Sequence, residues 1–379
     1  MTESMYARTG AGLLLRLHEV YGQRGPFSTA HVDVSRAAED AAEQVGLRWR
    51  AVLDALRDAG APQEHLDAVS RAAEQATDLP GDVQRTVVVN AEGILLDEQI
   101  PARTAAAGRA VFGTLPDAVP LLAEATSWVP YVVVQTQRAH AAVALRVAGR
   151  SGGVEREVEG EDFHMRKVRV GGWAQRRIQQ HAEEVWEGNA EAVAEEVVRV
   201  LRRSRAQLVV VAGDVRARQA LEAELNETGE VTAEVVGIDA NTLPEGSSTE
   251  ALDTGLQEAL GEQERRRLDD VLDRLAQGVG RGDTGVEGVP AVVGALQQGK
   301  VDVLLLHPDG LVDQRLGALA NAPWVATRAE EQPVEPLGEA PAGDTLARAA
   351  VLTNADVVVL EDPHPQLAEG AAAVLRWGS

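Results

Sequence analysis

The chain has 379 residues and a formal charge of -23 at pH 7, because 59 acidic residues outnumber 36 basic ones. It contains no cysteine, which excludes disulfides, thiolate zinc sites, iron–sulfur ligation and a cysteine nucleophile. No apolar run approaches the roughly 20 residues that cross a bilayer, and no charged-then-apolar leader begins the chain, so we expect a cytoplasmic protein with no membrane partner. The acidic balance argues against diffuse binding to DNA or RNA but leaves a restricted basic surface open.

The first block of the chain, residues 1–127, predicts an α+β domain. Apolar residues at helical spacing indicate helices, and alternating runs indicate strands. The expected elements are a helix over 13–20, a strand over 27–34, helices over 37–59 and 62–76, and a hairpin of 86–89 with 93–98. Residues 105–115 leave helix and strand open, Pro116 and Pro120 break the chain, and a domain boundary follows near Ser127.

The second block, residues 128–241, predicts a mixed α/β sheet. Its first half is rich in strands, and its second half alternates helices with strands. The expected elements are strands over 131–135, 141–147, 154–158 and 165–170, a helix over 176–203, a strand over 207–212, a helix over 215–225 and a strand over 231–238. The strand over 207–212 is mostly apolar, as expected for a strand covered on both faces.

The third block, residues 249–379, follows a linker at 242–248 and predicts a small α/β layer domain. The expected elements are helices over 249–276 and 289–298, strands over 301–306 and 324–327, a mobile loop over 330–343, a helix over 344–353 and strands over 356–360 and 373–377. The glycine-rich stretch 278–288 follows a helix, whereas a dinucleotide fingerprint should follow a strand, so we interpret it as a connector. His307-Pro308-Asp309 follows a buried strand and is interpreted as a turn.

The stretch 168–180, VRVGGWAQRRIQQ, is the candidate functional tip. A strand ends at Val170, Gly171 and Gly172 permit a tight turn, and a long helical pattern begins at Arg176 or Arg177. No acid lies between residues 163 and 180, which contain five basic side chains: Arg166, Lys167, Arg169, Arg176 and Arg177. A glycine turn flanked by cations suits contact with a polyanion, although an ordinary basic strand-to-helix turn has the same pattern.

Other candidate groups give weaker signals. His181 and Glu184 follow the glycine turn on the same helical pattern, where solvated helix residues are commoner than an acid/base pair. Arg199, Arg202, Arg203 and Arg205 form a second basic cluster, which could meet RNA or simply complement the C-terminal end of its helix. The histidines show no metal-ligand spacing, and neither a P-loop nor a nucleophile elbow is present, so we expect no metal and no cofactor.

Four segments resemble a known superfamily. Residues 282–306 (GDTGVEGVPAVVGALQQGKVDVLLL), 346–360 (LARAAVLTNADVVVL) and 371–377 (AAAVLRW) are similar to the third domain of archaeo-eukaryotic release factors and Pelota. Residues 25–41 (GPFSTAHVDVSRAAEDA) resemble the opening of an actinobacterial branch of that superfamily. The branch is related to the ribosome hibernation factor Balon and to the Vms-type peptidyl-tRNA hydrolases.

The resemblance implies an α/β (α+β) fold in three domains. These would be a decoding-site-like domain over 1–127, a ribonuclease-H-like mixed-sheet domain over 128–241 that carries the tip, and a domain over 249–379 like the kink-turn-binding ribosomal proteins. Release factors carry Gly-Gly-Gln at the tip, whereas Trp173 follows the glycine pair here. Vms-type hydrolases use Gly-x-x-Gln, which Gly172–Gln175 fits. Gln175 is therefore the catalytic candidate, because its amide could position a water while a backbone N–H faces developing charge.

The resemblance implies a translation factor that binds rRNA in the ribosomal A site. Gly171, Gly172, Trp173 and Ala174 would meet the RNA together with the five basic side chains. Because the release motif is altered, we favour occupancy of the ribosome in hibernation or stress without cleavage. Two alternatives stay open, namely hydrolysis of peptidyl-tRNA on stalled ribosomes through Gln175, and RNA binding away from the ribosome. An elongation-factor GTPase is a further partner that the resemblance implies.

Overall fold

The computed structural model describes most of the chain, in two compact units that are considered separately below. Unit 1 is formed by residues 128–266, and unit 2 by residues 13–127 together with 267–379. The described residues are 10–35, 41–75, 82–101, 108–126, 130–136, 140–147, 154–159, 190–202, 206–213, 215–231, 233–238, 249–328, 333–361 and 366–378. The division into three domains at the predicted boundaries stays a prediction.

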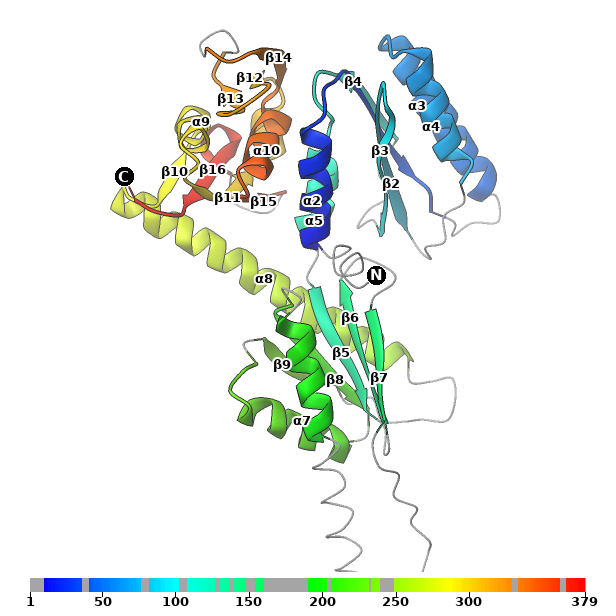
Figure 1. Cartoon of the computed structure of the whole chain (residues 1–379), viewed down its shortest axis with the longest axis vertical. Coiled ribbons are helices and arrows are strands. Elements are labelled where there is room, and N and C mark those ends of the chain that lie inside the picture. The colour runs from blue at the N-terminus through cyan, green and yellow to red at the C-terminus, as the bar shows by residue number, and fades with distance from the viewer. Residues whose placement is uncertain are drawn as a thin grey trace, which may run out of the picture. The chain divides into compact units, whose positions relative to one another are not determined.

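The N-terminal part of unit 2 is an antiparallel sheet covered by helices (Figure 1). The strand order is β3-β2-β1-β4, and the hairpin of β2 with β3 confirms the predicted one. The elements are α2 (Gly10–Tyr21), β1 (Phe27–Asp33), α3 (Ala41–Asp58), α4 (Gln63–Ala73), β2 (Val83–Asn90), β3 (Gly93–Pro101), β4 (Arg109–Gly113) and α5 (Val119–Thr126).

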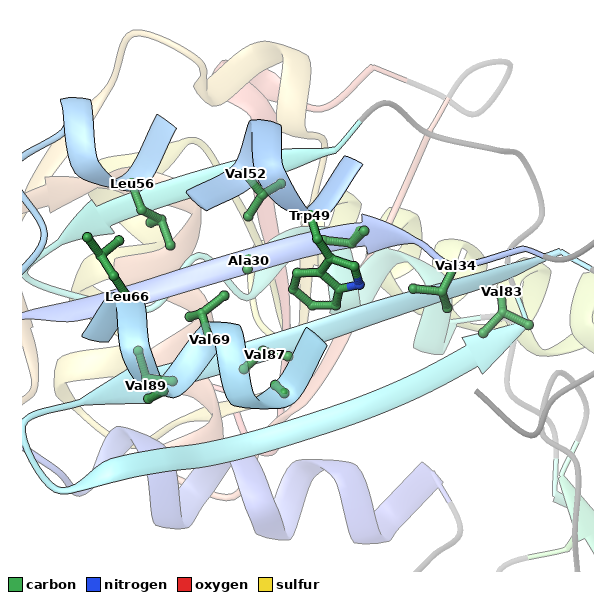
Figure 2. Close-up of a cluster of buried hydrophobic side chains, with 13 residues drawn as sticks. Ala30, Val34, Trp49, Val52, Leu56, Leu66, Val69, Val83, Val87 and Val89 are labelled. Carbon is green, nitrogen blue, oxygen red and sulfur yellow. The ribbon is translucent and has the colours of Figure 1, made fainter. Parts of the chain in front are cut away.

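One face of this sheet is closed by α3 and α4, as the helical spacing of their apolar residues predicts. Trp49, Val52 and Leu56 recur on one side of α3 and are buried. Figure 2 shows them pointing onto the strands, where they meet Val87 and other inward-facing side chains of the sheet. Side chains so deeply buried typically contribute about 2–5 kcal/mol each when tested by truncation to alanine, so this cluster fixes the fold of the module.

Two expectations for the end of this module need correction or completion. Pro120 was expected to break the chain, but it is the second residue of α5. Proline is compatible with the first helical turn, because the N–H that it lacks has no partner within the helix there. The ambiguous stretch 105–115 contains strand β4, whose residues 109–113 pair antiparallel with β1.

Unit 1 contains the predicted mixed sheet, in the order β7-β6-β5-β8-β9. Its antiparallel part joins β5 to β6 and β6 to β7, while β5, β8 and β9 run parallel. The elements are β5 (Pro130–Thr136), β6 (His140–Val147), β7 (Val154–Glu159), a helix over 190–202, β8 (Leu208–Gly213), α7 (Val215–Glu227) and β9 (Glu234–Ile238).

Both faces of this sheet are covered, which explains the apolar run in β8. Val209 and Val211 face a core that includes Val197 of helix 190–202 and Leu221 of α7. Leu208 and Val210 face a second core that includes Leu260 of α8 (Thr249–Arg281). A strand with apolar residues in both directions is typical of this arrangement, as the sequence predicted.

The C-terminal part of unit 2 has a four-stranded sheet, β10-β16-β11-β15, and a three-stranded sheet, β13-β12-β14. Only β11 with β15 is a parallel pair in the first sheet. The elements after α8 are β10 (Gly285–Glu287), α9 (Val289–Gln297), β11 (Val301–Leu306), the 3₁₀ turn η1 (Pro308–Leu311), β12 (Arg315–Leu319), β13 (Val325–Ala326), β14 (Pro336–Pro341), α10 (Ala342–Leu352), β15 (Asp356–Val359), the 3₁₀ turn η3 (Ala368–Gly370) and β16 (Ala371–Leu375).

The predicted mobile loop over 330–343 is wrong for its second half. Residues 336–341 form β14, which pairs antiparallel with β12, a strand that the sequence pattern did not reveal. Pro336 and Pro341 occupy the two ends of β14, where a missing N–H costs least. The turn expected at His307-Pro308-Asp309 is confirmed by η1.

The glycine-rich stretch 278–288 is only partly a connector. α8 continues through Gly278 to Arg281, and β10 begins at Gly285. A Cβ on Gly278 would lie 2.5 Å from the backbone nitrogen of Gly285, well inside van der Waals contact. Glycine at this position therefore lets the helix and the strand approach backbone to backbone.

The first turn of α9 is capped by a side chain from the far end of the chain. Glu369 has a left-handed backbone with φ of 52°, and its carboxylate Oε2 accepts a hydrogen bond from the Val289 amide at 2.9 Å. Gly288, just before the helix, has φ of 86°, which glycine tolerates. The helix N-terminus thus receives the negative group that its dipole favours from within the protein.

Candidate functional site

The predicted tip lies outside the residues that the structure describes. The described chain stops at Glu159, at the end of β7, and resumes at residue 190. The candidate residues within this interval are Arg166, Lys167, Arg169, Gly171, Gly172, Trp173, Ala174, Gln175, Arg176, Arg177, His181 and Glu184. Their roles therefore remain predictions from the sequence, and the geometry below concerns what flanks them.

The two flanks of the candidate segment lie in the same compact unit. β7 is an edge strand that pairs with β6, and helix 190–202 packs on the sheet through Val193, Val197 and Val200. These side chains have exposed fractions of 5%, 0% and 3%. The described chain on either side of the candidate segment is thus a paired strand and a packed helix.

The two described members of the second basic cluster are paired with carboxylates of the protein itself. Arg202 forms an ion pair of 2.7 Å with Glu230, and Arg199 pairs with Glu196 one helical turn away. Arg203 and Arg205 lie outside the described residues. A groove of about 600 Å³ beside Arg199 and Arg202 is lined by four glutamates, which disfavours a phosphate group there. These contacts favour a structural role for Arg199 and Arg202 over contact with RNA.

A similar internal pairing occurs on α8. Arg266 donates to Glu234 at 2.7 Å and to Glu262 at 2.9 Å, and Arg265 pairs with Glu262 at 2.8 Å. The hydrogen bonds that Arg266 donates to these carboxylates raise its pKa, so its charge is permanent and already balanced. Within the described residues, no group of three or more His, Cys, Asp or Glu side chains could hold a metal ion. None of the described helices is long and apolar enough to cross a bilayer.

The domain that flanks the candidate segment matches a known family. Residues 130–281 match the family model of bacterial archaeo-eukaryotic release factor family 2. This region of the chain is similar to the bacterial members of the release factor/Pelota superfamily. The match includes the whole interval 160–189, so the candidate tip lies within the matched residues.

Full-length relatives of this release factor-like chain occur in Mycobacterium tuberculosis. The uncharacterized proteins MT2704 and Rv2629 are each 26% identical to it over 379 residues, which cover 96% of this chain and 96% of each relative.

Solved structures of the superfamily are more distant. The archaeal termination factor aRF1 is 15% identical over 98% of both chains, with a TM-score of 0.25. Archaeoglobus fulgidus Pelota is 18% identical over 78% of this chain and 80% of its own, with a TM-score of 0.34. An archaeal Pelota is 14% identical over 97% of this chain and 94% of its own, with a TM-score of 0.40. The assignment to the superfamily rests on the family match.

A buried polar network in unit 2 was not foreseen from the sequence of this release factor-like chain. His31 Nδ1 lies 2.9 Å from Thr86 Oγ1, and its Nε2 lies 2.9 Å from the Asp117 carbonyl and 3.4 Å from the Asp117 carboxylate. The order Thr–His–Asp imitates a nucleophile, a base and an acid. However, the exposed fractions of Thr86, His31 and Asp117 are 1%, 2% and 3%, so no substrate reaches the hydroxyl.

This network stabilises the fold. Burial acts to raise the pKa of Asp117, but hydrogen bonds and charges from His31 and Arg109 outweigh it and hold the pKa below its usual value. Arg109 Nε lies 2.6 Å from the Asp117 carboxylate. The Asp117 amide donates to Thr29 Oγ1 at 3.1 Å, so both backbone and side chain of Asp117 are fixed just before α5. The alternating sequence of β1 suggests that its polar side chains face solvent. In the structure all seven residues of the strand are buried, so nothing in the sequence pointed to the network.

Proposed function

We propose that this chain binds the ribosomal A site as a release factor/Pelota-like translation factor and occupies it in hibernation or stress without cleavage. One observation carries the proposal. Residues 163–180 hold five cations and no acid in a chain of charge -23, and they lie within the region that matches the release factor family. A local reversal of sign in an acidic protein is the footprint expected of a confined RNA contact.

The charge distribution of the described surface supports this proposal. The arginine groups at 199, 202, 265 and 266 meet carboxylates of the protein itself, whereas residues 163–180 contain cations and no acid. Phosphate contacts are therefore expected to concentrate in this segment. Each neutralised phosphate lowers the slope of log K against log salt by roughly 0.7–0.9, so two lost contacts should reduce it by roughly 1.4–1.8.

Co-sedimentation with ribosomes tests the proposal. The protein should travel with ribosomes from starved cells through a sucrose gradient at low salt, and Arg176→Gln/Arg177→Gln should weaken the association and its salt dependence. Arg265→Gln/Arg266→Gln is the matched control, since it removes the same charge from a pair that is already balanced internally. If the parent protein stays at the top of the gradient, or if both double variants behave alike, the proposal is wrong.

Hydrolysis of peptidyl-tRNA is the second candidate function, favoured by the spacing of Gly172 and Gln175. In that case the purified protein should release peptide from stalled 50S–peptidyl-tRNA complexes, and Gln175→Ala should abolish release. Gln179→Ala is the matched control, because it removes an amide from the same segment. Equal release by the Gln175→Ala variant and the parent would remove Gln175 from the mechanism, and no release by the parent would favour occupancy alone.

The remaining proposals concern partners and location. We propose a cytoplasmic protein that an elongation-factor GTPase delivers to the ribosome, and addition of such a GTPase with GTP should raise the amount that co-sediments. RNA binding away from the ribosome would instead be favoured if free structured RNA competed with ribosomes at equal affinity. A filter-binding competition between the two distinguishes these outcomes.

A further inference from the structure

Helix α10 is buried on every side, which is unusual for a helix at the edge of a domain. Nine of its eleven residues, from Ala342 through Val351 except Gly343, are buried, including Asp344, Thr345 and Arg348. A helix that is covered all round lies between two layers and not on the surface of one. The second layer comes from the N-terminal part of unit 2, as the contacts of Asp344 and Arg348 demonstrate.

Asp344 caps a helix from the other end of the sequence. Its Oδ1 accepts hydrogen bonds from the amides of Ala118 at 3.0 Å and Val119 at 3.3 Å. Val119 is the first residue of α5. The first amides of a helix have no partner inside the helix, and a carboxylate there is favoured by the helix dipole. Asp344 therefore supplies the hydrogen-bond acceptor that the N-terminus of α5 lacks.

Arg348, one helical turn later, supplies a hydrogen-bond donor to the C-terminus of α2. Its Nε donates to the carbonyl oxygen of Tyr21 at 3.3 Å, and Tyr21 is the last residue of α2. Another nitrogen donates to the Leu319 carbonyl at 2.9 Å, and the guanidinium lies over the Trp324 ring at 5.5 Å. A cation is favoured at a helix C-terminus for the same reason that an anion is favoured at an N-terminus. Burial lowers the pKa of Arg348 to about 10, so it remains a cation at neutral pH.

Apolar contacts surround these two charges. Leu115, just before α5, is 5% exposed and clusters with Ala318 and Ala340 of the three-stranded sheet. A Cβ at Gly343 would meet Val119 Cγ2 at 3.3 Å, so α5 and α10 approach closely there. The joint therefore combines apolar packing with two buried polar side chains whose hydrogen bonds are satisfied across it, which makes partial opening costly.

We propose that residues 13–127 and 267–379 form one mechanical body, locked by α10 through Asp344 and Arg348, although they are the two ends of the chain. Each segment supplies groups that the other needs. The first supplies the termini of α5 and α2, and the second supplies the α10 side chains that hydrogen-bond to them. The two segments consequently move together, and a partner that binds one of them positions the other. This inference rests on the contacts of unit 2 and is independent of the proposed function.

Pulsed electron paramagnetic resonance on the full chain tests the single body. The chain has no cysteine, so Glu64→Cys on α4 and Gln298→Cys after α9 are unique labelling sites, and both positions are exposed. The expected result is one narrow distance distribution. Asp344→Ala should broaden it at least two-fold, and Asp344→Asn, which keeps the capping oxygen, should restore the narrow width.

Arg24→Gln provides the matched control. Arg24 and Glu335 also join the two segments, at 2.8 Å, but their side chains are 69% and 54% exposed. An exposed pair contributes little, so this variant should leave the distribution unchanged. A broad or split distribution in the parent would overturn the single body, and an Asp344→Ala distribution as narrow as that of the parent would overturn the lock.

Hydrogen exchange tests the same inference without any substitution, so a folding defect of a variant cannot affect the result. The amides of Ala118 and Val119, which donate to Asp344, should exchange with the same opening free energy as core amides of β11. Exchange of Ala118 and Val119 at least ten-fold faster than β11 would mean that the joint opens without unfolding, which contradicts the proposal.

Discussion

Replacing Gly278 by alanine should destabilise unit 2, although alanine is the better helix former. Gly278 lies inside α8, where glycine costs about 1 kcal/mol relative to alanine, so propensity alone predicts stabilisation. However, the new Cβ would lie 2.5 Å from both Gly285 N and Thr284 C, and 2.9 Å from the Thr284 carbonyl oxygen. All three are backbone atoms, which cannot rotate away. Overpacking of this kind costs about 1–3 kcal/mol, and rigid neighbours favour the upper end.

Gly280→Ala isolates the steric part of this effect. Gly280 lies in the same helix two residues later, is exposed, and a Cβ there would meet nothing within 4 Å. Both variants gain the same helix propensity, so their difference in unfolding free energy measures the clash alone and should be about 1–3 kcal/mol. Urea unfolding followed by circular dichroism measures this difference, and hydrogen exchange of β10 and β16 localises it. If both variants stabilise the protein equally, the close approach of α8 and β10 does not exist in solution.

Two further substitutions test buried charges in unit 2. Asp97→Ala should destabilise the protein by about 3 kcal/mol in urea unfolding, because it strands the Arg85 guanidinium, whose side chain is only 2% exposed. Asp54→Ala removes an exposed carboxylate of the same type and should change stability by less than about 1 kcal/mol, and equal losses would contradict the reasoning. Burial, with a smaller contribution from the Asp117 charge, raises the pKa of Asp344 to about 7, so the folded state holds this proton more tightly than the unfolded state. The stability contributed by this proton is fully present below the ordinary carboxyl pKa and is lost as pH rises to about 7, so Asp344→Asn should gain stability relative to the parent across that window, and a constant difference between the two curves would refute the assignment.

The elements predicted correctly are those in which buried apolar residues recur at regular spacing or form one continuous run. The stripe of Trp49, Val52 and Leu56 marks one buried face of α3, and the apolar run from Leu208 marks a strand covered on both sides. Where proline or glycine dominates, composition misled the prediction. Pro120 lies in the first turn of a helix, and residues 336–341 pair as a strand, because in both cases the missing N–H lies where no partner is needed.

The joint between the two ends of unit 2 could not be predicted from one sequence. In the sequence, Asp344 and Arg348 look like ordinary polar positions of an amphipathic helix. Nothing local reveals that the start of α5 and the end of α2 lie beside them. Their meaning depends on contacts across more than 200 residues, which a periodic pattern does not encode. The candidate tip, by contrast, was identified from the sequence alone. The roles of Gln175 and its neighbours stay predictions.

The capping of α9 by Glu369 has a consequence for how the C-terminal segment could meet nucleic acid. The amide of Val289 at that helix end already holds a carboxylate at 2.9 Å, so an approaching phosphate would encounter a negative charge instead of free donors. The N-terminus of α9 is therefore not an open anion site. A phosphate could reach the Val289 amide only if the Glu369 carboxylate first moved away from it.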